Sequence, residues 1–362
     1  MKEQTTTKKL TLGKRIALYT GRFFLWLFAT LAVLIAGLYI MLMYINKGPS
    51  PYVRDLFVAS VMESSAGGIL SSIFLSEEEI AAIQEKNNTE LLTEVTDTTL
   101  INVVAAQNSA SENSADSGAE SLPSEEAFIS GDGIEIFEVH GSTYNGLMMV
   151  VEDPSRVKVG VIDYFSLDTS GETLETLVNE YDCIAGINGG KYDDENGLGS
   201  GGMPEGIVIS EGRLLLGDPD TIYDVYGFNN EDVLIVGSMT AAQAVSMGIR
   251  DAVSFGPALI VNGRAAGYSG VGSGLNPRTA IGQRADGAVL LLVIAGRQAN
   301  SMGASMADLI EVMQEYGAVN AANLDGGMSS SMYYDGEELI SSCTIRSARR
   351  IPTAFLVERR SE

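Results

Sequence analysis

The chain has 362 residues, of which 45% are hydrophobic, so it can bury a sizeable core and is not disordered overall. Its formal net charge of −24 disfavours nucleic acid and anionic lipid headgroups as partners. Because His140 is the only histidine, double-histidine phosphodiesterase sites, histidine-cluster dinuclear centres and most zinc sites are excluded. A Ser-His-Asp triad would depend on His140, whose place on an apparent strand beside a turn favours an exposed or structural residue. Carboxylates must therefore carry any acid–base chemistry.

Near the N-terminus, residues 23–45 contain no charged side chain, and 23 residues at about 1.5 Å each span roughly a 30 Å hydrocarbon layer. We predict a transmembrane helix here. Residues 1–22 hold six basic residues against one acidic residue, a net charge of +5, which favours retention in the cytoplasm. A cleaved signal peptide is the alternative, but its apolar region is normally about 7 to 15 residues, and no A-x-A-like site follows. The sequence favours an uncleaved signal anchor, a single membrane pass and an extracellular domain.

Between this span and the folded domain lie two segments of different composition. Residues 46–87 have the pattern of short amphipathic helices and are expected to form a juxtamembrane stalk. Residues 88–127 hold eight acidic side chains, no basic ones and no aromatic ones. Such a composition predicts a flexible, self-repelling linker.

The folded domain is expected to cover residues 128–360. It combines many short strand patterns with few helices and no regular βαβ alternation, which indicates an α+β domain around a mixed sheet. The clearest helix covers residues 305–316, where Ser305 and Asp308 can form a capping box and Gly317 can end the helix.

The stretch most typical of a functional site is 323–332, Asn-Leu-Asp-Gly-Gly-Met-Ser-Ser-Ser-Met, which follows that helix and a short apolar run. Glycines allow backbone N–H groups to approach a ligand closely, while the amide, the carboxylate and the hydroxyls supply donors and acceptors. An ordinary tight turn is the alternative, since Asp-Gly is a strong hairpin signal.

Two further stretches favour a functional site over an ordinary tight turn. Residues 187–192 read Ile-Asn-Gly-Gly-Lys-Tyr, and residues 275–282 read Leu-Asn-Pro-Arg-Thr-Ala-Ile-Gly. Together with Gly256-Pro257, Gly296-Arg297-Gln298 and residues 323–332, they resemble in order and wording the phosphodiester glycosidase family over roughly residues 127–360. That family includes the lysosomal uncovering enzyme, which removes N-acetylglucosamine from a sugar phosphodiester, and bacterial proteins associated with exopolysaccharide. This chain departs from the family pattern at Met328, where a third glycine is usual, and at Lys191, between the glycine pair and the aromatic residue.

The resemblance implies that the matched positions line a pocket, and side-chain chemistry suggests their roles. We expect Asp325 to be the leading catalytic carboxylate and Arg278 to bind phosphate through its two-pronged guanidinium. A structural salt bridge between these two residues is the alternative. Asn188 and Asn323 would orient sugar hydroxyls or an acetamido group, with Asn188 counted among the catalytic residues. The expected substrate-binding residues are Gly189, Gly190, Asn276, Thr279, Asn323, Gly326, Gly327, Ser329, Ser330 and Gln298, with the glycine N–H groups forming anion-binding nests.

Three features of the expected site stay open. A second carboxylate could be Asp163, Glu205 or one of the acids in residues 193–196. No cofactor or metal site is expected, although residues 193–196 have the oxygen-rich character of a Ca²⁺ loop without its spacing, and a solvated acidic turn explains them as well. Cys183 and Cys343 are the only cysteines, and they could form a disulfide or remain separate buried thiols.

The function expected from these observations is that of a membrane-anchored hydrolase in the cell envelope. Its substrate would be a sugar-1-phosphodiester of the N-acetylglucosamine type in a cell-wall or exopolysaccharide glycan, and its reaction the cleavage of the glycosidic bond. A non-catalytic glycan-binding or envelope-assembly module on the same fold is the alternative, because the bulky Met328 can narrow a pocket. Serine hydrolase chemistry at Ser329 or Ser330 is disfavoured, since no base is placed for it.

Overall fold

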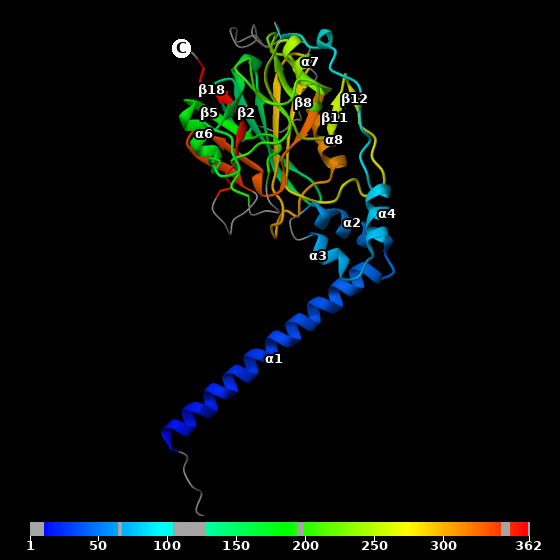
Figure 1. The fold of residues 1–362 in the computed structure, drawn as a ribbon, viewed down its shortest axis with the longest axis vertical. Coiled ribbons are helices and arrows are strands. Elements are labelled where there is room, and N and C mark those ends of the chain that lie inside the picture. The colour runs from blue at the N-terminus through cyan, green and yellow to red at the C-terminus, as the bar shows by residue number, and fades with distance from the viewer. Residues whose placement is uncertain (1–10, 64–66, 104–126, 194–198, 342–347, 361–362) are drawn as a thin grey trace, which may run out of the picture. The chain divides into compact units, whose positions relative to one another are not determined.

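The computed structural model describes residues 11–63, 67–103, 127–193, 199–341 and 348–360. The chain forms two compact units, residues 1–57 and 58–362, and each is described by itself. The first consists largely of helix α1, Leu12–Lys47 (Figure 1). Among the described residues, α1 is the one helix long and apolar enough to cross a membrane, with a mean hydropathy of 2.4 over its best window. It includes the predicted span 23–45 and extends beyond it at both ends.

The remaining helices are short. They are α2 (Pro51–Met62), which crosses the boundary between the units, α3 (Gly67–Ser72), α4 (Glu77–Lys86), α6 (Leu174–Glu180), α7 (Ala241–Ser246) and α8 (Met306–Glu315), with 3₁₀ turns η1 (Thr98–Leu100), η2 (Pro154–Arg156) and η4 (Gly327–Ser329). Helix α8 confirms the predicted capping box, because Ser305 Oγ accepts from the Asp308 N–H and Asp308 Oδ2 accepts from the Ser305 N–H. Gly317 follows it with φ +76°, a left-handed conformation suited to glycine.

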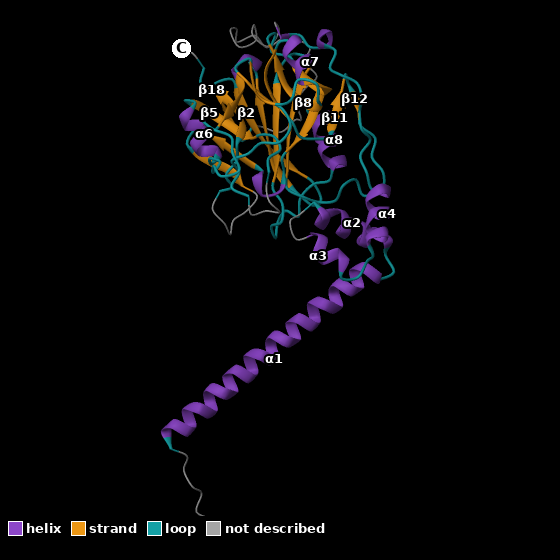
Figure 2. Ribbon diagram, viewed as in Figure 1, coloured by secondary structure: helices purple, strands orange, loops and turns teal. Residues whose placement is uncertain are grey.

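Three antiparallel sheets make up most of the second unit, and Figure 2 shows the helices at their periphery. The eight-stranded sheet has the order β1 (Ile129–Gly131), β2 (Ile134–His140), β3 (Asn145–Val151), β14 (Val289–Ile294), β13 (Arg278–Arg284), β15 (Ala318–Leu324), β11 (Ala258–Val261), β12 (Arg264–Ala265). One five-stranded sheet has the order β7 (Arg213–Leu216), β6 (Val208–Ser210), β10 (Ile249–Val253), β8 (Ile222–Asn229), β9 (Leu234–Thr240). The other has the order β17 (Glu337–Ser341), β16 (Ser331–Tyr334), β5 (Cys183–Asn188), β18 (Thr353–Glu358), β4 (Val157–Val161). This architecture confirms the α+β class, although the described strand pairs are all antiparallel where a mixed sheet was expected.

The largest apolar core lies on the eight-stranded sheet. Strand β14 is buried along its whole length, as its continuous run of Val, Leu and Ile residues requires, and α8 packs its apolar face against β15, β11 and β13. A second cluster surrounds β6, β8, β9 and β10, and a third lies between α6 and β5. The rigid sheets thereby fix the strand ends from which the polar motifs emerge.

Part of the segment expected to be a linker is ordered. Leu92, Thr96 and Ile101 are buried, and Thr96 exchanges hydrogen bonds with Val236 on β9, its N–H donating over 3.1 Å and its Oγ accepting over 2.9 Å. Arg264 pairs with Glu90 and Glu94, which removes part of the like-charge repulsion on which the expectation rested. Residues 88–103 therefore pack on the domain, whereas residues 104–126 lie outside the described part of the chain.

Candidate functional site

The ends of β13 and β15 bring two of the motifs together. These strands are antiparallel, and Thr279 on β13 pairs with Leu324 on β15. The start of β13, with Arg278, therefore lies beside the end of β15, which leads into Asp325. Sequence order alone could not show this proximity, because the two motifs are more than forty residues apart.

Asn188, at the end of β5, ties the third motif to the other two. Its Nδ2 donates to the backbone oxygen of Asp325 over 2.6 Å. Its Oδ1 accepts from Thr279 Oγ1 over 2.7 Å and from the Ser331 N–H over 3.2 Å. Asn188 is fully buried and is not part of the pocket wall. It holds the backbone that carries Asp325.

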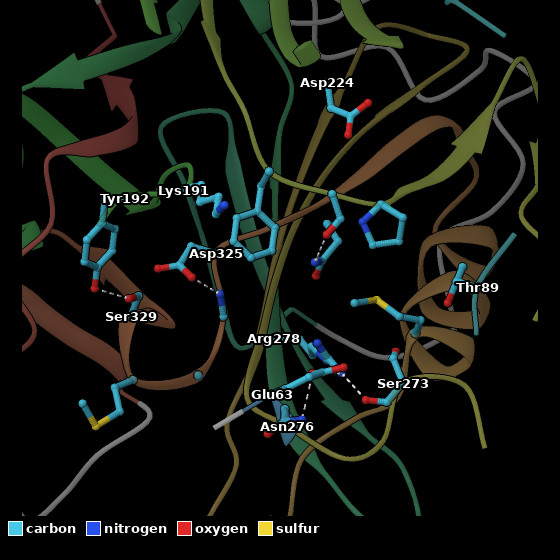
Figure 3. Close-up of a pocket in the computed structure, with 18 of the residues that line it drawn as sticks. Glu63, Thr89, Lys191, Tyr192, Asp224, Ser273, Asn276, Arg278, Asp325 and Ser329 are labelled. Carbon is cyan, nitrogen blue, oxygen red and sulfur yellow. Dashed lines mark hydrogen bonds and ion pairs between the residues drawn. The ribbon is translucent and has the colours of Figure 1, made fainter. Parts of the chain in front are cut away.

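A pocket of about 620 Å³ opens at these strand ends (Figure 3). Its described basic side chains are Lys191, Arg278, Arg297 and Arg349, and its described acidic side chains are Glu63, Asp224 and Asp325. Phe255, Pro257 and Met306 supply apolar wall. A concave site with an apolar wall and convergent charged groups is typical of small-molecule binding.

Asp325 has a strongly perturbed carboxyl group in this pocket. Its side chain is partly buried, and the loss of surrounding water raises its pKa from 3.8 to about 7. Hydrogen bonds from the Ser329 side chain and from the Gly326 N–H, the latter over 2.9 Å, act in the opposite direction and stabilise the ionised form. At neutral pH, Asp325 can therefore both accept and release a proton.

Ser329 connects Asp325 to a second set of side chains. The Tyr192 hydroxyl lies 2.9 Å from Ser329 Oγ, as the dashed line in Figure 3 marks, and Arg349 Nε donates to the same hydroxyl over 2.8 Å. The Arg349 guanidinium also lies 5.7 Å from the centre of the Tyr192 ring, a cation–π distance. This chain fixes the Ser329 hydroxyl that bonds the carboxylate.

Arg278 lines the pocket, but its guanidinium is engaged by the protein. Its Nε donates to the Ala304 oxygen, and its Nη2 donates to the oxygens of Ser273 and Gly274, each over 3.2 Å. Nη2 also lies 2.8 Å from Glu63 Oε2. The acidic partner of Arg278 is thus Glu63, rather than the Asp325 that the alternative from the sequence would require.

The expected anion-binding nests are not formed. The N–H of Gly189 donates to the Thr353 oxygen and that of Gly190 to Thr353 Oγ1, each over 3.0 Å. The N–H of Gly326 donates to Asp325 Oδ1, and that of Gly327 to the Pro277 oxygen over 2.9 Å. Since all four donors are used within the protein, none of them is available to an anion.

The other predicted site residues divide into two groups. Asn276, Asn323, Gly326, Gly327 and Ser329 line the pocket, together with the two departures Lys191 and Met328. Gly189, Gly190, Thr279, Ser330 and Gln298 lie outside its lining, and Gln298 Nε2 donates to the Ser341 oxygen. Among the described residues, Asn323 Oδ1 is buried without a hydrogen-bond partner, while its Nδ2 donates to the Gly256 oxygen over 2.7 Å.

Residues 181–358 match the family model for phosphodiester glycosidase, NAGPA. These residues form a phosphodiester glycosidase domain. The match contains Asn188, Arg278 and Asp325, so it covers all three motifs found in the sequence.

Individual relatives are distant. The SPbeta prophage-derived uncharacterized protein YomE of Bacillus subtilis (strain 168) is 28% identical over 184 residues, which cover 47% of this chain and 27% of that protein. This chain therefore spans about a quarter of the length of the curated relative it matches. The auto-inhibited catalytic domain of zebrafish N-acetylglucosamine-1-phosphodiester alpha-N-acetylglucosaminidase aligns with a TM-score of 0.51 at 21% identity, over 63% of this chain and 82% of that one. A hypothetical protein from Synechocystis aligns with a TM-score of 0.44 at 18% identity, over 63% and 62%. The zebrafish match shows a shared fold.

Several pocket residues of the phosphodiester glycosidase domain were not predicted from sequence. Glu63, Thr89 and Leu91 come from segments that precede the domain by sequence, and Asp224 is the third residue of β8. No motif marks them, and only tertiary packing brings them to the pocket. The candidate second carboxylates Asp163 and Glu205 are not in the lining, and Glu205 pairs with Lys191. In addition to Asp325, the described carboxylates that line the pocket are those of Glu63 and Asp224.

Some of the residues expected to bind a metal or form a disulfide lie outside the described part of the chain. Within the described residues, no group of three or more His, Cys, Asp or Glu side chains could hold a metal ion, and residues 194–198 are not described. Cys183 is a buried free thiol whose pKa burial raises to about 11, which argues against a nucleophile. Because Cys183 is free, the structure does not form the disulfide that was one of the two alternatives, and Cys343 itself lies outside the described residues.

Proposed function

We propose that this protein hydrolyses the glycosidic bond of a sugar-1-phosphodiester, with an N-acetylglucosamine-type sugar on one side of the phosphate. The observation that carries the proposal is the Asp325 carboxyl group, whose pKa is raised to about 7 at the wall of a pocket that also receives four basic side chains. A carboxylate that ionises near neutral pH suits general-base or nucleophilic work, and basic side chains suit an anionic leaving group.

In the proposed reaction, the pocket residues Asp325 and Asn323 have separate chemical roles. A phosphate monoester is a weakly basic leaving group, so it needs charge stabilisation more than it needs a proton. Asp325 in its ionised form attacks the anomeric carbon or activates a water molecule for that attack. Asn323 Oδ1, buried without a partner among the described residues, accepts a hydrogen bond from a sugar hydroxyl or an acetamido N–H.

The proposed location follows from the N-terminal helix. Helix α1 anchors the protein in the cell membrane with residues 1–22 in the cytoplasm, because those residues carry a net charge of +5. The glycosidase domain then faces the extracellular side, where its substrate is part of a cell-wall or exopolysaccharide glycan.

The test uses the full-length protein in detergent and an N-acetylglucosamine-α-1-phosphodiester. Released sugar and released phosphomonoester are both measured, for the wild type, for Asp325→Asn and for Asp163→Asn, whose exposed carboxylate lies outside the pocket. We expect equimolar release by the wild type and by Asp163→Asn, and a loss of at least about 100-fold in Asp325→Asn. Saturable binding of the phosphodiester without any release would instead support a glycan-binding module.

A further inference from the structure

We propose that Tyr192 and Arg349 are positioning residues for the carboxylate of Asp325, and that they act on it through the Ser329 hydroxyl. The inference rests on the proposed function and deepens it, because it names the residues that hold the reacting carboxylate in its ionised form. It assigns Ser329 to the support of Asp325, whereas the sequence suggested a substrate-binding residue. Figure 3 shows Tyr192, Ser329 and Asp325 together on one side of the pocket.

The sheet topology brings Tyr192 and Arg349 together. Strands β5 and β18 are antiparallel neighbours, with Asn188 opposite Ala354, so the end of β5 lies beside the start of β18. Tyr192 is four residues after the end of β5, and Arg349 is four residues before the start of β18. The N–H groups of the residues before and after Tyr192 donate to backbone oxygens of other segments over 2.7 and 2.8 Å. Tyr192 therefore has a fixed place beside Arg349.

The order of donors in the chain from Arg349 to Asp325 is fixed by its two ends. A guanidinium has N–H donors and no acceptor, whereas an ionised carboxylate has only acceptors. Arg349 Nε donates to the Tyr192 hydroxyl over 2.8 Å, and that hydroxyl lies 2.9 Å from Ser329 Oγ. The Ser329 side chain is hydrogen bonded to the Asp325 carboxylate. Since each hydroxyl has one hydrogen, Ser329 must give its own to ionised Asp325 and receive that of Tyr192.

This order of donors favours the ionised form of Asp325. A proton on the carboxyl group makes it a donor as well, and the Ser329 hydrogen then loses the acceptor that fixes its direction. Ser329 and Tyr192 are only 5% and 7% exposed, so water cannot readily take the place of either hydroxyl. The pKa of Asp325 is raised by burial and lowered by the Ser329 hydroxyl and the Gly326 N–H. Ser329 is therefore the point at which more distant residues act on the carboxyl group.

The charged groups around the pocket do not account for the state of Asp325. Besides Asp325, the described charged side chains in the lining are those of Glu63, Lys191, Asp224, Arg278, Arg297 and Arg349. Among these described groups, none contributes to the shift in the Asp325 pKa. Arg349 therefore affects Asp325 through the two hydroxyls rather than through its charge at a distance.

The test removes the Tyr192 hydroxyl and follows the pH dependence of turnover in the full-length protein. Tyr192→Phe keeps the ring, whose centre lies 5.7 Å from the Arg349 guanidinium, but it leaves Ser329 without its donor. We expect the midpoint of the rise in kcat/KM for the N-acetylglucosamine-α-1-phosphodiester to move up by about 0.5 to 1 pH unit. At pH 7, kcat should fall by about 3- to 10-fold with KM unchanged within about twofold. Ser329→Ala should move the midpoint in the same direction.

Tyr181→Phe is the matched control, because it deletes a tyrosine hydroxyl in a similar setting outside the pocket lining. The Tyr181 hydroxyl accepts from the Val161 N–H over 3.0 Å and donates to the Val161 oxygen over 3.2 Å. The Tyr181 ring centre lies 5.4 Å from the Lys158 ammonium group, a cation–π contact like that of Tyr192. Tyr181→Phe should leave the midpoint and kcat unchanged.

The part played by Arg349 is tested with two substitutions and a double variant. Arg349→Lys keeps a donor for the Tyr192 hydroxyl, so it should move the midpoint less than Arg349→Met does. In the double variant Tyr192→Phe/Arg349→Met, the midpoint should match that of Tyr192→Phe alone, because both residues act through one chain. Additive shifts in the double variant would overturn the assignment of Arg349.

The ionisation of Asp325 can also be followed without turnover, from the carboxyl C=O band in infrared difference spectra between each protein and its Asp325→Asn counterpart. We expect a midpoint near pH 7 in the wild type and about 0.5 to 1 pH unit higher in Tyr192→Phe. If this midpoint moves but no protein hydrolyses the phosphodiester, the proposed function fails and the positioning role stands. An unmoved infrared midpoint in Tyr192→Phe, with a lower melting temperature, would show a purely structural role and overturn the inference.

Discussion

Substitution of Asp325 by asparagine should make the folded protein more stable at alkaline pH while abolishing turnover. The carboxyl group loses its proton near pH 3.8 in the unfolded chain and near pH 7 in the folded protein. Between these values the folded state holds more protons, so the stability contributed by this group falls as the pH rises and stays low above pH 7. A difference of about three pKa units corresponds to at most about 4 kcal/mol. Partial exposure to water in the pocket reduces this, and we expect about 1 to 3 kcal/mol.

The assay is thermal unfolding of the full-length protein in detergent at pH 5.5, 7 and 8.5, which keeps the protein above its isoelectric point of about 4.3. The melting temperature of Asp325→Asn should exceed that of the wild type, by more at pH 8.5 than at pH 5.5. Asp163→Asn, at an exposed position, should show no such pH-dependent gain. A shift of equal size at all three pH values, or a less stable variant at pH 8.5, would refute the reasoning that burial of an ionised Asp325 costs folding free energy.

Three further outcomes follow from the same contacts. Because the proposed reaction uses ionised Asp325, kcat/KM for the phosphodiester should rise with pH to a plateau, with the midpoint of the rise near pH 7, and a fall over that range would make Asp325 an acid. Asn188→Ala should destabilise the fold by about 2 to 4 kcal/mol in denaturant unfolding, because three contacts of a buried amide are lost; a change below 1 kcal/mol would contradict its linking role. Gly274→Ala, where φ is +72° and a Cβ would lie 2.3 Å from the Ser60 backbone nitrogen, should loosen residues 58–63 and speed their proteolysis relative to Gly263→Ala, where φ is also positive but the space is open.

The sequence was most informative where local chemistry decides the structure. The capping box at Ser305 and Asp308 involves residues three apart, and the apolar residues of α1 form one uninterrupted run, so both were predictable. The pocket residues Asp325, Arg278 and Asn276 were found because each lies in a motif with an ordered resemblance to one family. In each case the signal lies within a few neighbouring residues.

The partners of those residues depend on tertiary structure and left no local signal. Whether Arg278 faces Asp325 or Glu63 is decided by how segment 58–63 packs on residues 274–276, more than two hundred positions away. The acidic composition of residues 88–103 suggested self-repulsion, but composition cannot reveal that Arg264 neutralises two of their carboxylates or that Leu92 reaches the core. Asn188 was expected to touch the sugar because amides often do, whereas its burial shows that its amide links three strand ends.

The charges around the pocket bear on how a protein with a net charge of −24 would bind the proposed anionic substrate. Two of the four pocket bases are paired with carboxylates, Lys191 with Glu205 and Arg278 with Glu63, so most of their field is cancelled at short range. Arg297 and Arg349 line the same pocket, where they donate to the Asn276 amide and the Tyr192 hydroxyl. At distances beyond about 8 Å, salt screens the acidic surface, whereas a phosphate inside the pocket meets these nearby cations directly. Attraction is thereby confined to the pocket, next to Asp325, and the surface elsewhere disfavours polyanions such as nucleic acid.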